Sequence, residues 1–201
     1  KVGIVSIHVG DEPSKLELLE QVISQFDIPI TQYYPTHINR SKSLLEAGID
    51  FALKGGFIDF TTSTTAQIIA QGEVPAAQAL ALALEKNAPI SQLTMSSDGN
   101  ASLPVFDAKG NLIDLQMGLV SSLHQAMVDA VKLFNVPIEL ALAAITESPA
   151  NILRLTQKGR IAVDKDADIN LLNPHSLAIE AVYSKGKLVF SEGKTCIKTP
   201  F

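Results

Sequence analysis

The sequence predicts a parallel α/β fold followed by a shorter region of antiparallel strands. Short apolar segments alternate four times with amphipathic segments of helical period between residues 1 and 155. Repeated strand-then-helix units are typical of parallel sheets. From Gly159 onward the pattern changes to short strand-like segments separated by turn residues. A chain of 201 residues that is 46% hydrophobic and 18% charged has enough apolar surface for a folded core.

The boundaries of the first part follow from helical spacing and from stop signals. Pro13 is suited to the start of a helix, and Gly55 and Gly56 end the second helical segment. The expected strands cover residues 1–7, 28–35, 57–60 and 93–97, the expected helices cover residues 16–26, 41–54, 75–87 and 119–134, and residues 137–155 hold one or two more helices.

The second part predicts a small β domain. Strands are expected at residues 169–172, 178–182 and 187–190, with a hairpin that turns at Lys185 and Gly186. We therefore place a domain boundary near residue 158, which divides the chain into residues 1–158 and residues 159–201.

Charge and composition exclude several classes of function. The chain has 21 Asp and Glu against 16 Lys and Arg, which disfavours a nucleic-acid partner because phosphate affinity comes mainly from cations. No apolar run approaches the ~20 residues that cross a membrane, so a membrane role is not expected. Cys196 is the sole cysteine and fits a reducing, cytoplasmic location.

The beginning of the chain is unusual. Lys1 is followed at once by a Val- and Ile-rich strand pattern, with no Met and no polar lead-in. A domain rarely begins on a strand of this kind. We therefore expect the chain to be a piece of a longer polypeptide.

Three polar residues follow strands of the first part and are candidates for a metal site. His8 closes the first strand, His37 the second and Asp98 the fourth. The C-terminal ends of parallel strands meet on one face, where barrel enzymes hold their active sites. Two imidazoles and a carboxylate suit Zn²⁺ or a similar cation. A single histidine after a strand is more often structural, so the metal-site hypothesis depends on all three residues together. The other two histidines, His124 and His175, are expected at the solvated surface.

Two further residues are candidates for substrate binding. Arg40 lies three positions after His37, where a guanidinium can hold a carboxylate at two points; a surface ion pair or a helix-start contact is the alternative. Ser102 follows Asp98 and either donates a hydrogen bond to substrate or shapes a loop.

Several segments resemble those of the isoaspartyl dipeptidases, also called β-aspartyl peptidases, of the amidohydrolase superfamily. The more specific ones are residues 36–40 (Thr-His-Ile-Asn-Arg) and 96–102 (Ser-Ser-Asp-Gly-Asn-Ala-Ser), and residues 54–59 agree with them. Residues 159–169 and 182–187 resemble the exit from the barrel and a hairpin of the small β-sandwich. The resemblance runs along essentially the whole chain in order.

The resemblance implies that the chain is the C-terminal half of a metal-dependent (β/α)₈ TIM-barrel hydrolase, followed by strands of a β-sandwich. His8 and His37 would bind the second of two Zn ions. Asp98 would bind the first, hydrogen-bond the bridging hydroxide and shuttle the proton during hydrolysis of a β-aspartyl dipeptide. Arg40 and Ser102 would hold a carboxylate of that substrate. One departure is Ala101, where Gly is expected in the better-known family members; a methyl group fits there if the backbone is not left-handed.

The family also needs a His-x-His pair and a carboxylated Lys from the first half of the barrel, and no His-x-His occurs in this sequence. The N-terminal half of the polypeptide is therefore an expected partner, and the resemblance further suggests a homo-oligomer. Two alternatives stay open. One is another amidohydrolase, of the dihydroorotase, hydantoinase or N-acyl amino-acid deacylase type; the other is a non-catalytic assembly protein with the same fold.

Overall fold

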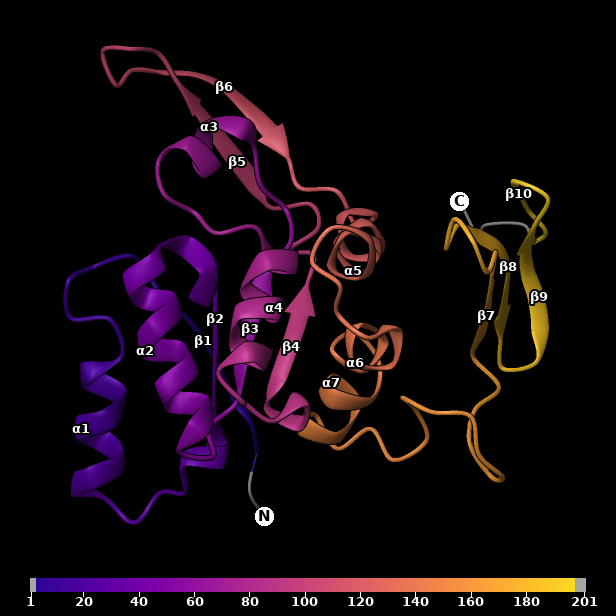
Figure 1. Cartoon of the computed structure of the whole chain (residues 1–201), viewed down its shortest axis with the longest axis horizontal. Helices are drawn as coiled ribbons and strands as arrows, with labels where there is room; N and C mark the ends of the chain where they lie inside the picture. The colour runs from indigo at the N-terminus through magenta and orange to yellow at the C-terminus, as the bar shows by residue number, and fades with distance from the viewer. Residues whose placement is uncertain (1–2, 198–201) are drawn as a thin grey trace.

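The computed structural model describes residues 3–197 and begins with parallel strands that alternate with helices (Figure 1). The strands lie side by side, and the helices cover their outer side. The parallel strands are β1 (Val5–His8), β2 (Tyr33–Thr36), β3 (Ile58–Thr61) and β4 (Leu93–Ser96), and the main helices are α1 (Glu17–Gln25), α2 (Lys42–Leu53), α4 (Ala76–Glu85), α5 (Ser122–Lys132), α6 (Ile138–Ala143) and α7 (Glu147–Ile152).

Backbone pairing aligns the C-terminal ends of these strands. β1 pairs in parallel with β2 so that His8 lies opposite Thr36, and β3 pairs in parallel with β4 so that Thr61 lies opposite Ser96. Within residues 3–197 no backbone ladder joins β2 to β3. These two strands are nevertheless in contact, and side chains form the link between them.

The main core lies between the strands and the helices that cover them. Phe51 of α2, Phe60 of β3 and Leu80 of α4 are fully buried, and burial of each such side chain contributes about 1.5–3 kcal/mol. Helix α2 ends close to the following strand because Gly56 has no side chain: a Cβ there would lie 2.1 Å from the Phe51 ring. Gly56 of the Gly55-Gly56 stop signal therefore also leaves room for the Phe51 ring to pack.

The expected helices of the first part are present within three residues of their expected ends, and residues 137–155 form two helices. β1, β2 and β4 are shorter than expected, whereas β3 has the expected length and is displaced by one residue. β1 begins at Val5, and of the residues expected before it, Lys1 and Val2 lie outside the described part of the chain. β2 begins at Tyr33 because Pro29 leads into one turn of 3₁₀ helix over Ile30–Gln32.

Two structural units of the first part were not expected from the sequence. One is the short helix α3 (Ala66–Ala70). The other is an antiparallel hairpin of β5 (Ser102–Phe106) and β6 (Leu112–Met117), which projects beyond the C-terminal ends of β3 and β4 (Figure 1). Its turn is held by Asp107, whose Oδ1 accepts hydrogen bonds of 2.8 Å from the backbone N–H groups of Lys109 and Asn111.

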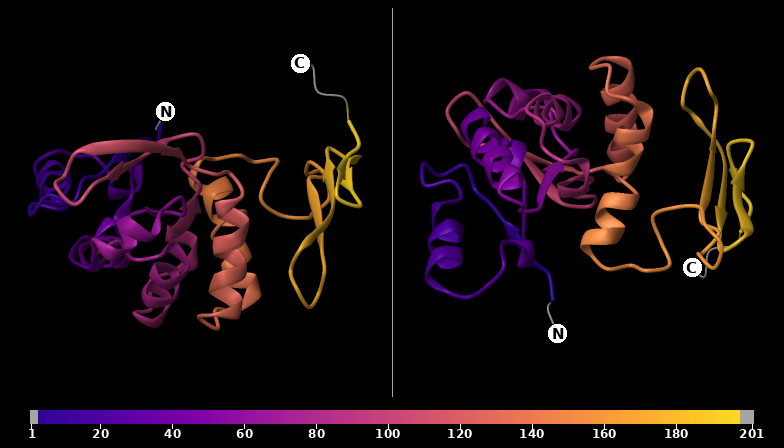
Figure 2. Two further views of the ribbon diagram at one scale, coloured as in Figure 1. Left: turned by 90° about the horizontal axis from the view of Figure 1, so that it is seen from above. Right: turned by 60° about the horizontal axis from the view of Figure 1, so that its bottom comes forward.

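The last strands form a separate antiparallel sheet, which lies beyond α5 and α6 in both views of Figure 2. Its members are β7 (Ile169–Leu172), β8 (Ile179–Ser184), β9 (Lys187–Ser191) and β10 (Lys194–Thr195). The expected hairpin turn is confirmed: Ser184 pairs with Lys187, and Lys185 and Gly186 have φ angles of 48° and 76°. Two consecutive positive φ angles are typical of a two-residue hairpin loop.

The two parts of the chain are joined by contacts as well as by the backbone. His124 of α5 was expected at the solvated surface, but it is half-buried and its Nε2 lies 3.0 Å from the Leu177 carbonyl oxygen. His175 is exposed, as expected, and its carbonyl accepts a hydrogen bond from Lys132.

The domain boundary near residue 158 stays a prediction; it lies between the end of α7 and the start of β7. Among the helices in residues 3–197, none has the length and apolar character that a membrane span requires.

Candidate active site

The three candidate metal ligands lie at or just beyond the C-terminal ends of parallel strands. His8 is the last residue of β1. His37 follows β2 directly with a φ of 66°, and Asp98 follows β4 by two residues with a φ of 49°. Each of the latter two departs from the strand direction through a left-handed backbone, which non-glycine residues adopt infrequently.

The structure brings His8 and His37 into contact. The Nδ1 atom of His8 lies 2.9 Å from the Nε2 atom of His37, and the ring planes are inclined by 62°. His37 is buried and His8 is exposed. The second ring nitrogen of His37, Nδ1, lies 2.6 Å from Oγ1 of Thr61 on β3. The two histidines therefore place ring nitrogens at the C-terminal ends of the strands. The ring of His37 is held in position by Thr61.

The surroundings of His37 favour its neutral form. Burial, together with the positive charge of Arg40, lowers the pKa of His37 to about 4. The carboxylate of Asp98 acts in the opposite direction and raises this pKa. Near pH 7 the His37 ring is therefore neutral and has a lone pair on one nitrogen, which is the form that binds metal ions.

The loop that carries Asp98 is held against the base of the β5–β6 hairpin. The N–H of Asn100 donates to the Gly118 carbonyl at 2.8 Å, and the N–H of Gly118 donates to the Ala101 carbonyl at 2.8 Å. A Cβ at Gly118 would lie 2.7 Å from the Asp98 carbonyl oxygen. Ala101 is not left-handed, so its methyl group is accommodated, and Ser102 is the exposed first residue of β5 rather than part of a loop.

Arg40 ends the 3₁₀ turn that follows His37 and is exposed. It forms no ion pair with another residue of the described chain. Its charge acts on the half-buried Glu73, whose pKa is raised by burial and lowered in part by a hydrogen bond from Thr64 and by Arg40. The guanidinium thus stands at the same edge as His37, where it is free to receive an anion.

A buried polar network behind the two histidines was not identified from the sequence. Its centre is Asp59 of β3, which accepts hydrogen bonds from Thr36 at 2.6 Å, from Ser96 at 2.5 Å and from Thr94 at 2.7 Å. The hydroxyl of Tyr34 also contacts it. Burial raises the pKa of the Asp59 carboxyl, and these hydroxyl groups oppose that shift.

Asp59 could have been found in the sequence. A carboxylate inside a run of otherwise apolar strand residues is rarely buried unless it is paired or hydrogen-bonded. Residues 57–60, Phe-Ile-Asp-Phe, carry this signal.

The donor groups at this edge fit part of a metal site. Imidazole nitrogens and a carboxylate are ligands that zinc and similar cations accept. Within residues 3–197, however, no three His, Cys, Asp or Glu side chains are arranged to hold a metal ion together. Structural and catalytic zinc sites take at least three protein ligands, so the residues described here account for an incomplete set.

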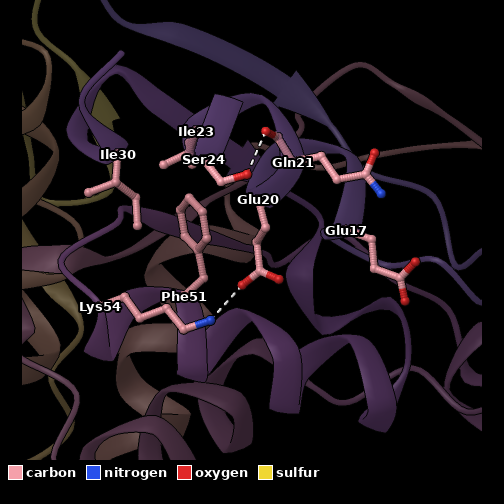
Figure 3. Close-up of a pocket in the computed structure, with 8 residues that line it drawn as sticks. All are labelled: Glu17, Glu20, Gln21, Ile23, Ser24, Ile30, Phe51 and Lys54. Carbon is pink, nitrogen blue, oxygen red and sulfur yellow. Dashed lines mark hydrogen bonds and ion pairs between the residues drawn. The ribbon is translucent and has the colours of Figure 1, made fainter. Parts of the chain in front are cut away.

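Two hollows of the described surface lie away from these residues. One of about 500 Å³ lies between α1 and α2 and is lined by Glu20, Phe51 and Lys54, with an ion pair of 2.6 Å between Lys54 and Glu20 (Figure 3). Another of about 660 Å³ lies between α5–α7 and the last sheet, next to His124 and Tyr183. Neither hollow is lined by a candidate site residue. The candidate site is therefore identified by the side chains at the strand ends and not by the size of a cavity.

Comparisons with known proteins bear on the fold and the family of the chain. The sequence pattern of the amidohydrolase family matches residues 67–201. A solved β-aspartyl dipeptidase of Fervidobacterium islandicum AW-1, in complex with a β-Asp-Leu dipeptide, is 34% identical with a TM-score of 0.86 over 100% of this chain. A second structure of a β-aspartyl dipeptidase from that organism is 31% identical with a TM-score of 0.82. An amidohydrolase of Thermotoga maritima is 16% identical with a TM-score of 0.60 over 94% of this chain, which supports the fold alone.

The matches also bear on the extent of the chain. It covers 51% and 49% of the two β-aspartyl dipeptidase chains and 44% of the Thermotoga chain. The chain therefore spans about half the length of these proteins. The predicted fold class, part of a TIM barrel followed by a β-rich region, is confirmed.

Proposed function

This chain belongs to the amidohydrolase family, and we propose that it is the C-terminal half of a metal-dependent hydrolase that cleaves the isopeptide bond of β-aspartyl dipeptides. The contact between His8 and His37, 2.9 Å apart at two adjacent strand ends, carries this proposal. The likeness to a β-aspartyl dipeptidase solved with β-Asp-Leu supports the choice of substrate class.

His8, His37 and Asp98 are the residues that would hold metal in this half of the protein. Two zinc ions, when bound, would supply a hydroxide near neutral pH and polarise the scissile carbonyl. His37 is prepared for this role by burial and by its contact with Thr61. His8 is exposed at the edge of the site, where further ligands from another segment have access.

Asp98 is the proposed proton shuttle. Its loop is fixed by Gly118 at the strand end, and its charge acts on His37. In amide hydrolysis the attacking oxygen loses a proton as its bond to the carbonyl carbon forms, and the departing nitrogen gains a proton as the carbon–nitrogen bond breaks. A single carboxylate that accepts the first proton and delivers the second balances both steps.

Arg40 and Ser102 are the proposed substrate-binding residues. The guanidinium of Arg40 is exposed beside His37, and Ser102 is exposed at the start of β5, four residues after Asp98. A two-point contact between a guanidinium and a carboxylate fixes both position and orientation. Together they would hold a carboxylate of the dipeptide so that its isopeptide bond faces Asp98.

The N-terminal half of the same polypeptide is the proposed partner. It would supply the remaining metal ligands and cover the outer edge of β1, most of whose residues are exposed, because unpaired strand edges invite aggregation. The assembled protein is proposed to form a homo-oligomer and to act in the cytoplasm.

A substrate panel on the complete polypeptide tests this function. The protein, purified with its bound metal measured by mass spectrometry, is assayed with β-Asp-Leu, with α-Asp-Leu and with a cyclic amide such as dihydroorotate. We expect zinc to be present and kcat/KM to be highest for β-Asp-Leu. A preference for the cyclic amide indicates another amidohydrolase, and absence of both metal and activity indicates a non-catalytic protein; either result overturns the proposal.

A further inference from the structure

β2 and β3 are linked by side chains and not by backbone hydrogen bonds. We call the line along which these two strands meet the seam. The buried Asn39 accepts a hydrogen bond from the backbone N–H of Thr61 at 2.8 Å and donates one to the Thr61 carbonyl at 3.0 Å. Its amide therefore pairs with Thr61 as a neighbouring strand would. The position of Thr61 relative to the end of β2 is fixed by these two bonds.

Thr61 also reaches the candidate metal ligand directly. Its Oγ1 lies 2.6 Å from Nδ1 of His37, while Nε2 of the same ring faces His8. Thr61 and His37 are 7% and 5% exposed, so water does not compete freely for this contact. Each ring nitrogen of His37 thus has one partner, Thr61 for Nδ1 and His8 for Nε2.

The backbone of His37 needs such support. A φ of 66° places it in the left-handed region, and a non-glycine residue held there costs of order 1 kcal/mol or more. A strained residue keeps one conformation only where its surroundings determine it. Here the surroundings are the Thr61 hydroxyl and the turn that contains Asn39.

We propose that Thr61 is a positioning residue that accepts a hydrogen bond from the Nδ1–H of His37 and so keeps the lone pair of Nε2 directed into the metal site. This role rests on the proposed function, because it matters only if His37 binds metal. The opposite polarity, with Thr61 donating to Nδ1, would place the ring proton on Nε2 and block that atom as a ligand. Histidines that bind metal usually donate their second N–H to an acceptor, and loss of that acceptor typically weakens metal binding 10–100-fold.

The test compares Thr61→Val with Thr61→Ser in the complete polypeptide. Valine keeps the branched shape and removes the hydroxyl, whereas serine keeps the hydroxyl. Thr62→Val is the matched control, since Thr62 is equally buried but its hydroxyl contacts Ser122 at 2.7 Å. Zinc affinity is measured by competition with a chelator, and the proton position on His37 by imidazole ¹⁵N chemical shifts of the metal-free protein; neither readout requires substrate.

We expect Thr61→Val to weaken zinc binding about 10–100-fold, and Thr61→Ser and Thr62→Val to bind zinc within about threefold of the wild type. The wild-type shifts should place the proton of His37 on Nδ1. Unchanged zinc affinity in a folded Thr61→Val protein overturns the proposal, as does a proton on Nε2. If Thr61→Val does not fold, the wild-type shifts decide. Zinc binding that depends on Thr61 without hydrolysis of β-Asp-Leu would overturn the proposed function and leave this role intact.

Discussion

The carboxylate of Asp59 accepts a hydrogen bond of 2.6 Å from the hydroxyl of Thr36, across the seam where β2 and β3 lack a backbone ladder. Thr36 directly precedes His37, and Ser96, which also donates to Asp59, lies two residues before Asp98. One buried side chain thus connects the strand ends that carry two candidate site residues.

Asp59 should give the protein a distinctive dependence of stability on pH. Burial raises its pKa above the ordinary value of 3.8, so the folded protein binds this proton more tightly than the unfolded chain does. The free energy of unfolding therefore falls as pH rises from 3.8 through the folded-state pKa. We expect the wild-type value minus the Asp59→Asn value to decrease with rising pH in urea unfolding; a difference that is constant or increases contradicts this.

Asn39 should contribute strongly to stability. Replacement by Ala removes the acceptor of the buried Thr61 N–H and both hydrogen bonds donated by the side-chain amide, to Thr61 and to Val74. An unsatisfied buried group costs about 1–3 kcal/mol, so we expect Asn39→Ala to lower the free energy of unfolding by at least that amount. Asn151→Ala, at an exposed position of α7, should change it by less than about 0.5 kcal/mol. Equal effects of the two substitutions in urea unfolding would be inconsistent with this contribution of the Asn39 hydrogen bonds.

Gly118 should control the position of Asp98. A methyl group at this residue would lie 2.7 Å from the Asp98 carbonyl oxygen, and the loop must shift to relieve the contact. We expect Gly118→Ala to lower kcat for β-Asp-Leu about tenfold or more, since small misplacements of catalytic groups are costly. Gly10→Ala is the control, because a Cβ added at Gly10 would meet no other atom within 4 Å. The kcat of this variant should match that of the wild type. A Gly118→Ala enzyme with wild-type kcat would show that the loop tolerates the displacement.

His37 and His124 should differ in their effect on metal content. His37→Asn removes a ring that contacts His8, whereas His124→Asn removes only a contact to the Leu177 carbonyl. We expect the zinc content of the complete polypeptide to fall in the first variant and to be unchanged in the second. Treatment with a chelator should abolish hydrolysis in wild type, and zinc should restore it. Full zinc content in His37→Asn would exclude His37 as a ligand.

Much of the parallel fold could be predicted because its signals are local. Apolar spacing located α1, α2 and α4 within two residues of their ends, and Lys185 and Gly186 correctly marked the turn between β8 and β9. The β5–β6 hairpin was not predicted from the sequence. The residues between its strands, 107–111 (Asp-Ala-Lys-Gly-Asn), carry an ordinary turn signal.

The candidate site was predictable only in part. The positions of His8 and His37 after strands could be inferred from the sequence, because parallel register brings consecutive strand ends together. The roles of Thr61 and Asn39 could not, because a hydroxyl or amide in a strand or turn gives no sign of which distant group it contacts. Cross-strand partners of this kind depend on register and rotamer, which a single sequence does not encode locally.

The most direct measurement of the central claim is kcat/KM for β-Asp-Leu in Asp98→Asn, compared with the wild type in the complete polypeptide. Asparagine keeps the size of the side chain and removes its ability to carry a proton, so we expect a decrease of about 10²–10⁴. Asp50→Asn, on the exposed surface of α2, should leave kcat/KM unchanged. An Asp98→Asn enzyme that hydrolyses β-Asp-Leu at the wild-type rate would contradict the assignment of this strand end as the active site.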